Sequence, residues 1–189
     1  MRARDNPFSS DRVEGLRYRL PEGLSWDQLL ERLASLRWRA ALVGPHGRGK
    51  TTLLEELAPR VTARGFRVRT VTLRQEERRS DWKLLRSLGP DDILFLDGAE
   101  LLGRLAWTAV KLRCRRLVIT SHRPGLLPTL LECDTSPELL ADLVRELAGE
   151  LTGEEPEVRE LFARHDGNLR AVFWEMYDQA YSRNRSITS

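Results

Sequence analysis

The sequence predicts an α/β fold: a three-layer sandwich in which helices cover both faces of a mostly parallel sheet of about five strands. Two observations predict it. Strand-like apolar runs alternate with helix-like segments from residue 25 to about residue 135, the order that builds a parallel sheet between helices. The residues from 136 to 182 read as helices alone, so we expect a small helical lid at the C-terminal end.

The first half of the chain supplies three strands and three helices. Ser25 is a favourable helix cap, and leucines with helical spacing follow it. Gly65 and the pair Gly89-Pro90 are helix-ending residues, and the strands between them are apolar or alternate apolar with polar residues. The expected elements are helix 25–36, strand 38–44, helix 50–65, strand 66–74, helix 80–88 and a strand within 92–100 whose apolar run ends at Asp97.

The second half begins with strands and ends with helices. Ser136-Pro137 is a typical helix start, and Asp166-Gly167 is expected to separate two helices. The last residues, 183–189, are polar and expected to fray. The expected elements are helix 99–113, strand 116–122, a short strand 129–134, helix 136–151 and two helices within 156–181.

Composition indicates a soluble globular protein, with 41% apolar and 31% charged residues among 189. No apolar run reaches the ~18 residues of a membrane span, and the N-terminus lacks the apolar core of a secretory signal. We therefore expect a cytoplasmic protein without a membrane span. Cys114 and Cys133 form no C-x-x-C pair, so reduced thiols are expected rather than a disulfide or a metal site.

The net charge of +3 is too small to require a nucleic-acid partner, but the charge is unevenly distributed. Residues Arg60–Arg86 contain nine Arg or Lys against three Asp or Glu, whereas acidic residues dominate from Glu132 to Glu160. The basic segment is compatible with a DNA-facing surface. It is equally compatible with an ordinary solvated surface, and both interpretations stay open.

The stretch GPHGRGKT, Gly44–Thr51, matches the phosphate-loop pattern G-x-x-x-x-G-K-[ST] at every fixed position, with a strand before it and a helix after it. Glycines let backbone N–H groups approach phosphate oxygens, and the helix amino end adds a positive potential. A plain turn would not need the lysine, and only three of the 31 basic residues are lysines. The residues expected to bind phosphate are Gly44, Pro45, His46, Gly47, Arg48, Gly49, Lys50, Thr51 and Thr52.

Asp97 ends the apolar strand that follows the phosphate loop by about fifty residues. A carboxylate at that place can hold Mg²⁺ together with the hydroxyl of Thr51, as the Walker B aspartate does. One strand, 66–74, intervenes along the chain. It predicts an extra strand between the loop strand and the Asp97 strand, the arrangement of additional-strand ATPases.

The residue that would orient the attacking water is displaced. Gly98 follows Asp97 where such ATPases usually have glutamate, and the nearest acid is Glu100. Glu100 could act on the γ-phosphate region or simply favour a helix amino end. His122, after the fourth strand, is the second candidate to contact the γ-phosphate. Lys50, Glu100 and His122 are therefore the expected catalytic residues.

The chain resembles AAA+ and related signal-transduction ATPases, in particular compact bacterial members of the ExeA and TniB kind. The resemblance rests on four stretches: NPF at 6–8, GPHGRGKTT at 44–52, ILFLDGAE at 93–100 and HDGNLRAVFWEMYD at 165–178. It implies that segment 1–24 lies beside the adenine of ATP, and that Arg170 of a sensor 2 helix faces the nucleotide. No arginine finger can be assigned, so an oligomer is possible but not indicated.

These observations divide the chain into four expected regions: an N-terminal segment 1–24, an α/β core 25–135, a helical lid 136–182 and a tail 183–189. The expected function is ATP binding and Mg²⁺-dependent ATP hydrolysis that drives a conformational change on a macromolecular partner, DNA or protein. The first alternative is a nucleotide-dependent switch with little turnover, which Gly98 favours. A small-molecule kinase is the second, and a GTPase is disfavoured because no N-K-x-D occurs.

Overall fold

The computed structural model describes residues 6–73, 86–149 and 155–187. By its contacts the chain forms two units. The core unit comprises residues 18–45 and 49–133, and the C-terminal unit comprises residues 1–17, 46–48 and 134–189. The four regions expected from the sequence, with limits at 24/25, 135/136 and 182/183, stay predictions. The observed divisions fall at 17/18 and 133/134, and three residues of the phosphate loop group with the C-terminal unit.

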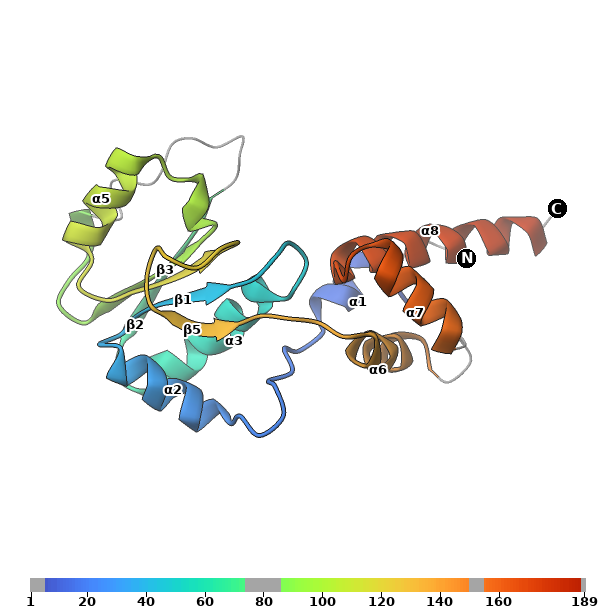
Figure 1. Ribbon diagram of the computed structural model, residues 1–189, viewed down its shortest axis with the longest axis horizontal. Helices are drawn as coiled ribbons and strands as arrows, with labels where there is room; N and C mark the ends of the chain where they lie inside the picture. Colours follow the sequence, from blue (N-terminus) through green and yellow to red (C-terminus); the bar gives the residue numbers. More distant parts are fainter. Residues whose placement is uncertain (1–5, 74–85, 150–154, 188–189) are drawn as a thin grey trace. The chain divides into compact units, whose positions relative to one another are not determined.

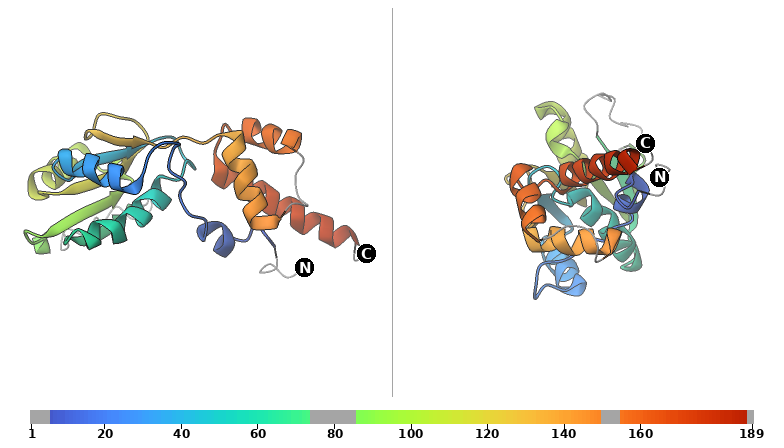
Figure 2. Two further views of the ribbon diagram at one scale, coloured as in Figure 1. Left: turned by 90° about the horizontal axis from the view of Figure 1, so that it is seen from below. Right: turned by 90° about the vertical axis from the view of Figure 1, so that its right-hand side faces the viewer.

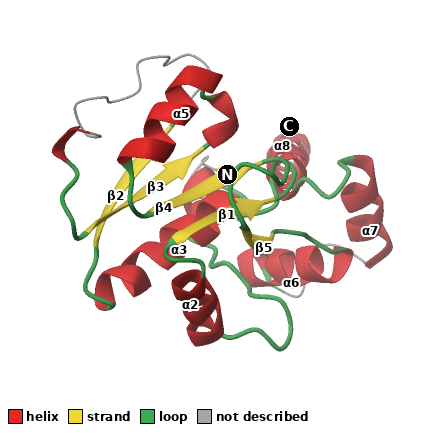
Figure 3. Ribbon diagram, turned by 60° about the vertical axis from the view of Figure 1, so that its left-hand side comes forward, coloured by secondary structure: helices red, strands yellow, loops and turns green. Residues whose placement is uncertain are grey.

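The core unit is built on a five-stranded sheet in which every neighbouring pair is parallel (Figure 3). The spatial order is β2-β3-β4-β1-β5. This confirms the predicted α/β class and the mostly parallel sheet. The strands are β1 (Arg39–Val43), β2 (Arg67–Thr72), β3 (Asp92–Asp97), β4 (Leu117–Ser121) and β5 (Thr129–Glu132).

The extra strand exists, but its predicted identity was wrong. The strand between β1 and β3 is β4, whereas β2, the expected candidate, lies at the edge of the sheet. Val43 of β1 is in register with Ser121 of β4, and Leu96 of β3 is in register with Ile119. Succession along the chain does not determine succession in space, because each helical crossover can skip over a strand position.

Helices cover both faces of the sheet, since alternate residues of each strand point to opposite sides (Figure 1). On one face, Leu42, Phe95 and Val118 are buried with α2 (Trp26–Ser35) and α3 (Lys50–Ala63). On the other face, their neighbours in the strands are buried with α5 (Arg104–Arg113). The sheet is therefore the middle layer of a three-layer sandwich, as predicted.

Two predicted helices need comment. Helix 99–113 is interrupted: a 3-10 turn (Ala99–Leu101, labelled η2) comes first, and α5 begins only after Gly103, whose backbone is extended. Helix 80–88 lies almost entirely outside the described residues. Helix α2, by contrast, begins as predicted. The Ser25 hydroxyl accepts a hydrogen bond from the backbone N–H of Gln28 at 3.2 Å, and the Gln28 side chain accepts one from Ser25 N–H at 2.8 Å.

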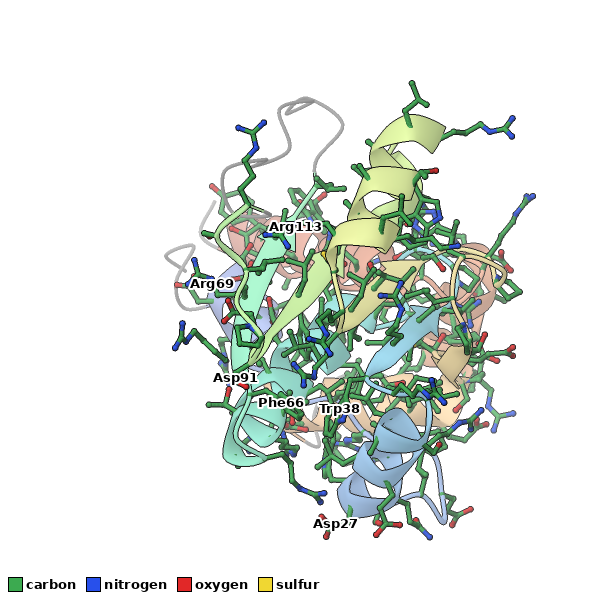
Figure 4. All side chains as sticks on the ribbon, turned by 90° about the vertical axis from the view of Figure 1, so that its left-hand side faces the viewer. Asp27, Trp38, Phe66, Arg69, Asp91 and Arg113 are labelled. Atoms are coloured by element: carbon green, nitrogen blue, oxygen red, sulfur yellow. The ribbon has the colours of Figure 1, made fainter. Side chains whose placement is uncertain are left out.

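The amino ends of the strands are closed by aromatic residues. Trp38 precedes β1 and Phe66 precedes β2, and their ring centroids lie 4.3 Å apart (Figure 4). The Arg116 guanidinium lies 4.7 Å from the centre of the Phe66 ring. Ligands of parallel α/β sheets bind at the opposite edge, at the carboxyl ends of the strands.

The C-terminal unit packs four helices around its own apolar core (Figure 2, orange to red for the last three). The break between the last two helices is where the sequence predicts it, because Asp166 and Gly167 both have positive φ angles. The NPF stretch belongs to this unit: Asn6 donates to the backbone carbonyl of Tyr177 at 2.9 Å, and Phe8 stacks on Phe173 at 6.4 Å. The helices are α1 (Ser10–Glu14), α6 (Pro137–Ala148), α7 (Glu155–Arg164) and α8 (Leu169–Ile187).

No helix within the described parts of the chain is both long enough and apolar enough to cross a membrane.

Candidate functional site

The candidate site of the core unit lies at the carboxyl ends of β1, β3 and β4. Three predicted site residues come together there: Gly44 follows β1, Asp97 is the last residue of β3, and His122 follows β4. Lys50 and Thr51 reach the same edge from the first turn of α3. This is the sheet edge at which ligands of parallel α/β proteins bind.

The base of the phosphate loop is held against two strands by its backbone. Gly44 N–H donates to the carbonyl of Ser121 at 3.2 Å, and Cys133 N–H donates to the carbonyl of Val43 at 2.6 Å. A Cβ atom at Gly44 would lie 2.4 Å from the Cys133 carbonyl oxygen, a distance that no side chain tolerates. Position 44 therefore requires glycine for reasons of packing as well as of phosphate access.

Lys50 is the first residue of α3 and follows Gly49, whose φ of 76° is favourable only for glycine. Its ammonium donates to the carbonyls of Gly44 and Pro45, each at 2.7 Å. Burial lowers the pKa of Lys50, and the negative charges of Glu100 and Asp97 act in the opposite direction. The loop thus holds a partly desolvated cation that an anion would stabilise.

Thr51 and Asp97, the predicted metal-binding pair, are in contact. The Thr51 hydroxyl donates to one Asp97 carboxylate oxygen at 2.9 Å. The other oxygen accepts from the Thr120 hydroxyl at 2.5 Å, and Thr120 in turn accepts from Gly98 N–H at 2.8 Å. Two hydroxyls from neighbouring elements therefore fix the orientation of one carboxylate.

Gly98 explains how the displaced acid returns to the site. Its φ of 82° turns the chain out of β3 into the 3-10 turn that carries Glu100. A Cβ atom at Gly98 would lie 3.2 Å from the Leu73 carbonyl, so a glutamate at this position would be strained and crowded. Glu100 then pairs with His122, with 3.1 Å between the carboxylate and the ring Nε2. The structure thus brings the two candidate water-orienting residues together.

The tip of the loop is described with the C-terminal unit, to which His46, Gly47 and Arg48 belong by contact. His46 is exposed. A Cβ atom at Gly47 would lie 1.8 Å from the amide oxygen of Asn168. Arg48 donates to the Asp134 carboxylate, to the Thr135 hydroxyl at 2.8 Å and to the Asp166 carbonyl at 2.7 Å.

The remaining predicted phosphate-binding residues are less constrained. Thr52 is half-buried in the first turn of α3. Arg170 is exposed and is the second residue of α8. Within the described ranges no ion pair joins Arg170 to Asp166, the pairing that would have made it a simple surface arginine.

Three residues of the site were not singled out by the sequence. Thr120 was one of several polar residues at a strand tip, and only the strand order shows that it neighbours Asp97. Tyr18 packs against Gly49, where a Cβ atom would lie 3.1 Å from the tyrosine ring. The Cys133 thiol hydrogen-bonds to the Tyr18 side chain; burial raises the pKa of Cys133, which this bond and Lys50 partly oppose. Both cysteines are buried free thiols.

Thr120→Val should destabilise the core unit by about 1–3 kcal/mol, because the isosteric change leaves the Gly98 N–H and one Asp97 oxygen without their partner. Chemical denaturation followed by circular dichroism measures this loss. Thr52→Val is the matched control, since Thr52 is half-buried in the same sheet-edge region but outside this network. Equal stability of the two variants would contradict the role given to Thr120.

Comparison with known proteins supports the fold. No protein-family model and no curated protein matches the chain. Among solved structures, a RuvB variant of Thermotoga maritima matches with a TM-score of 0.51 at 21% identity, over 82% of this chain and 61% of RuvB. AMPPCP-bound DnaA of Aquifex aeolicus matches with a TM-score of 0.54 at 17% identity, over 89% of this chain and 68% of DnaA.

The chain therefore spans about 61% of the length of the RuvB structure it matches. Both neighbours are AAA+ ATPases. The closer resemblance to ExeA and TniB proteins stays a prediction. The chain has the α/β fold of the AAA+ P-loop ATPases.

Proposed function

We propose that this chain binds ATP with Mg²⁺ and hydrolyses it, and that hydrolysis changes its conformation against a macromolecular partner. The observation that carries the proposal is the position of Lys50 and Thr51 at the amino end of α3, with Thr51 on the Asp97 carboxylate. DnaA, one of the structural neighbours, was solved with the ATP analogue AMPPCP, which supports the same ligand class here.

Phosphate binding is favoured because the Lys50 side chain is buried and its ammonium hydrogen-bonds to neutral groups of its own loop. Its present partners are two carbonyls of its own loop, and burial lowers its pKa. Phosphate oxygens carry full negative charge, and charge-assisted hydrogen bonds are roughly twice as strong as neutral ones. The loop N–H groups and the amino end of α3 add to the attraction. A triphosphate therefore fits this site better than a neutral ligand.

The metal would be held by the Thr51 hydroxyl and the Asp97 carboxylate. Mg²⁺ prefers oxygen ligands and binds through one or two protein groups plus phosphates and water, so this pair suffices. In the described part of the chain, no cluster of three or more His, Cys, Asp or Glu could hold a metal alone. When bound, Mg²⁺ would neutralise charge on the β- and γ-phosphates.

Hydrolysis requires a group that orients water towards the γ-phosphate. Glu100 is the first candidate, because it is the nearest acid after Asp97 and its negative charge opposes the lowering of the Lys50 pKa. His122, 3.1 Å from Glu100, would hold that carboxylate in position or contact the phosphate itself. Lys50, Glu100 and His122 are thus the proposed catalytic residues.

A nucleotide-dependent switch with little turnover is the second candidate function. The observation that favours it is the pairing of Glu100 with His122, because a carboxylate engaged by His122 is not free to orient water for hydrolysis. A small-molecule kinase is the third and the least supported, because residues Glu132–Glu160 are dominated by acids rather than by phosphate-binding arginines.

The partner is proposed only by class, as DNA or protein. Both named neighbours are AAA+ ATPases, and the chain's likeness to ExeA and TniB proteins is part of this proposal. Arg170 would report the nucleotide state to the helical lid through a contact with the γ-phosphate. A cytoplasmic location completes the proposal, which assigns no oligomeric state because no arginine finger can be identified.

Lys50→Ala should weaken ATP binding by about tenfold or more, because it removes a charge-assisted contact worth about 1.5–3 kcal/mol. Isothermal calorimetry with ATP measures the affinity, and phosphate release measures turnover. Lys111→Ala, which changes another lysine on an exposed helix face, is the control. Wild-type affinity and turnover in Lys50→Ala would refute the phosphate-loop assignment.

Glu100→Gln separates hydrolysis from binding. If Glu100 orients water, the variant keeps its ATP affinity and loses about 10²-fold or more of its turnover. Glu55→Gln, an exposed position on α3, controls for the loss of one negative charge. Unchanged turnover removes Glu100 from the mechanism and assigns the role to His122. A wild-type protein that binds ATP without measurable turnover supports the switch.

Arg170→Ala should lower the affinity for ATP more than the affinity for ADP, because the γ-phosphate is the group that Arg170 is proposed to contact. Calorimetry with both nucleotides gives the ratio. Arg159→Ala, another exposed arginine of the C-terminal unit, is the control. An equal effect on the two nucleotides would leave Arg170 as a surface residue.

A further inference from the structure

A hollow of about 480 Å³ opens on the core unit beside the Glu100–His122 pair. One wall is formed by the 3-10 turn and the start of α5, with Leu102, Arg104 and Trp107. The other wall is the loop between β4 and β5, with Arg123 and Leu126. The volume is sufficient for one large side chain and part of its backbone. Lys50 and Thr51 do not line the hollow, so it is distinct from the phosphate loop.

Most residues that line this hollow come from a basic segment of the chain. Residues 101–131 contain six Arg or Lys and no Asp or Glu. Arg104 and Arg123 come from the two opposite walls, and both are exposed. The one carboxylate in the lining, that of Glu100, is already paired with His122. A ligand that brings carboxylates would therefore meet opposite charge on both sides.

The helix α5, whose first turn contributes to the hollow, also carries exposed leucines. Leu105 and Leu112 are 89% and 84% exposed, and their spacing of seven residues places them on one face of α5. Leu101, in the 3-10 turn, is exposed as well. These are three of the five large apolar side chains exposed in the described part of the chain, so the apolar exposure is concentrated here. Figure 3 shows α5 on one face of the sheet.

The exposed leucines of this surface favour a protein ligand over a nucleic acid. A single strand of nucleic acid is held by exposed aromatic rings for stacking and by basic residues for phosphate. Here the aromatic residue, Trp107, is partly buried against the core, with the Lys111 ammonium 6.0 Å from its ring centre. Leucines provide no stacking surface, but they do suit the apolar face of a peptide. The combination favours a peptide with both apolar and acidic residues.

We propose that this hollow and the outer face of α5 bind a peptide segment of a partner protein in which an apolar side chain is flanked by carboxylates. The apolar side chain packs on Leu102, Trp107 and Leu126, and the carboxylates pair with Arg104 and Arg123. Peptide binding is independent of the proposed ATPase function. Only one consequence rests on that function: a carboxylate that reaches His122 competes with Glu100 and so changes the turnover.

Selection from a random peptide library displayed on phage, against the full chain, tests the chemistry of the ligand. Sequences with an apolar residue between Asp or Glu residues are expected to be enriched. The chain carrying Arg104→Glu and Arg123→Glu serves as the counter-selection. Enrichment of basic sequences, or no enrichment over the counter-selection, overturns the proposal.

Fluorescence anisotropy with one selected peptide then tests the location. The double charge reversal should weaken binding by about tenfold or more, as expected for two lost opposite-charge contacts replaced by like-charge ones. Arg115→Glu, an exposed arginine of the same acid-free segment outside the hollow, should change it less than about threefold. A similar effect of both changes would mean that net charge alone attracts the peptide.

A second variant and a second probe complete the test. Leu105→Ser with Leu112→Ser alters only exposed side chains, so the fold is retained and binding should still weaken. A fluorescent oligothymidylate is the nucleic-acid probe. If it binds more tightly than the peptide and loses affinity with the same arginine changes, the site takes nucleic acid and the peptide proposal is wrong. Because peptide affinity is measured without nucleotide, the peptide proposal is tested separately from the proposal of ATP hydrolysis.

Discussion

The buried Lys50 side chain is the constraint on which the geometry of the core unit depends. Burial disfavours its charge, and two loop carbonyls and the nearby carboxylates of Glu100 and Asp97 offset that cost. The loop can deliver those carbonyls only because Gly44 approaches the Cys133 backbone more closely than any other residue could. Gly44 N–H also donates to the Ser121 carbonyl of β4. The position of the Lys50 ammonium is therefore linked to the relative positions of the phosphate loop, β1 and α3.

The strand order determines which side chains hydrogen-bond to the Asp97 carboxylate. Since β4 lies between β1 and β3, the Thr120 hydroxyl reaches one oxygen of Asp97 while Thr51 reaches the other. Thr120 also holds Gly98 N–H, so the turn that leaves β3 is bound to the same network. The turn then carries Glu100 back towards Lys50. A glycine after the aspartate is thus compatible with an acid near the phosphate site, although the acid comes two residues later than usual.

Much of this arrangement could be predicted from the sequence, and the failures have physical reasons. Apolar periodicity predicted the α/β class and the parallel sheet, and the loop pattern pointed to Thr51 and Asp97, which are in contact, because these features depend on local spacing. The strand between β1 and β3 was misassigned, since chain order does not reveal which crossover skips a position. Thr120 was overlooked for the same reason. The interruption of helix 99–113 depends on the extended backbone at Gly103, which a helical apolar pattern conceals.

The Glu100–His122 pair lies between two parts of the core unit for which different ligands are proposed. The Glu100 carboxylate acts to raise the pKa of Lys50 in the proposed phosphate site, and both side chains of the pair line the hollow beside α5. A partner can change the activity of such a site only if it binds two arrangements of the pair with different affinity. The two arrangements are Glu100 paired with His122 and Glu100 released from it. A carboxylate of the partner can bind His122 only in the second arrangement, so it would bind that arrangement more tightly. Under the proposed function, part of the free energy of partner binding would then release the Glu100 carboxylate, which hydrolysis needs.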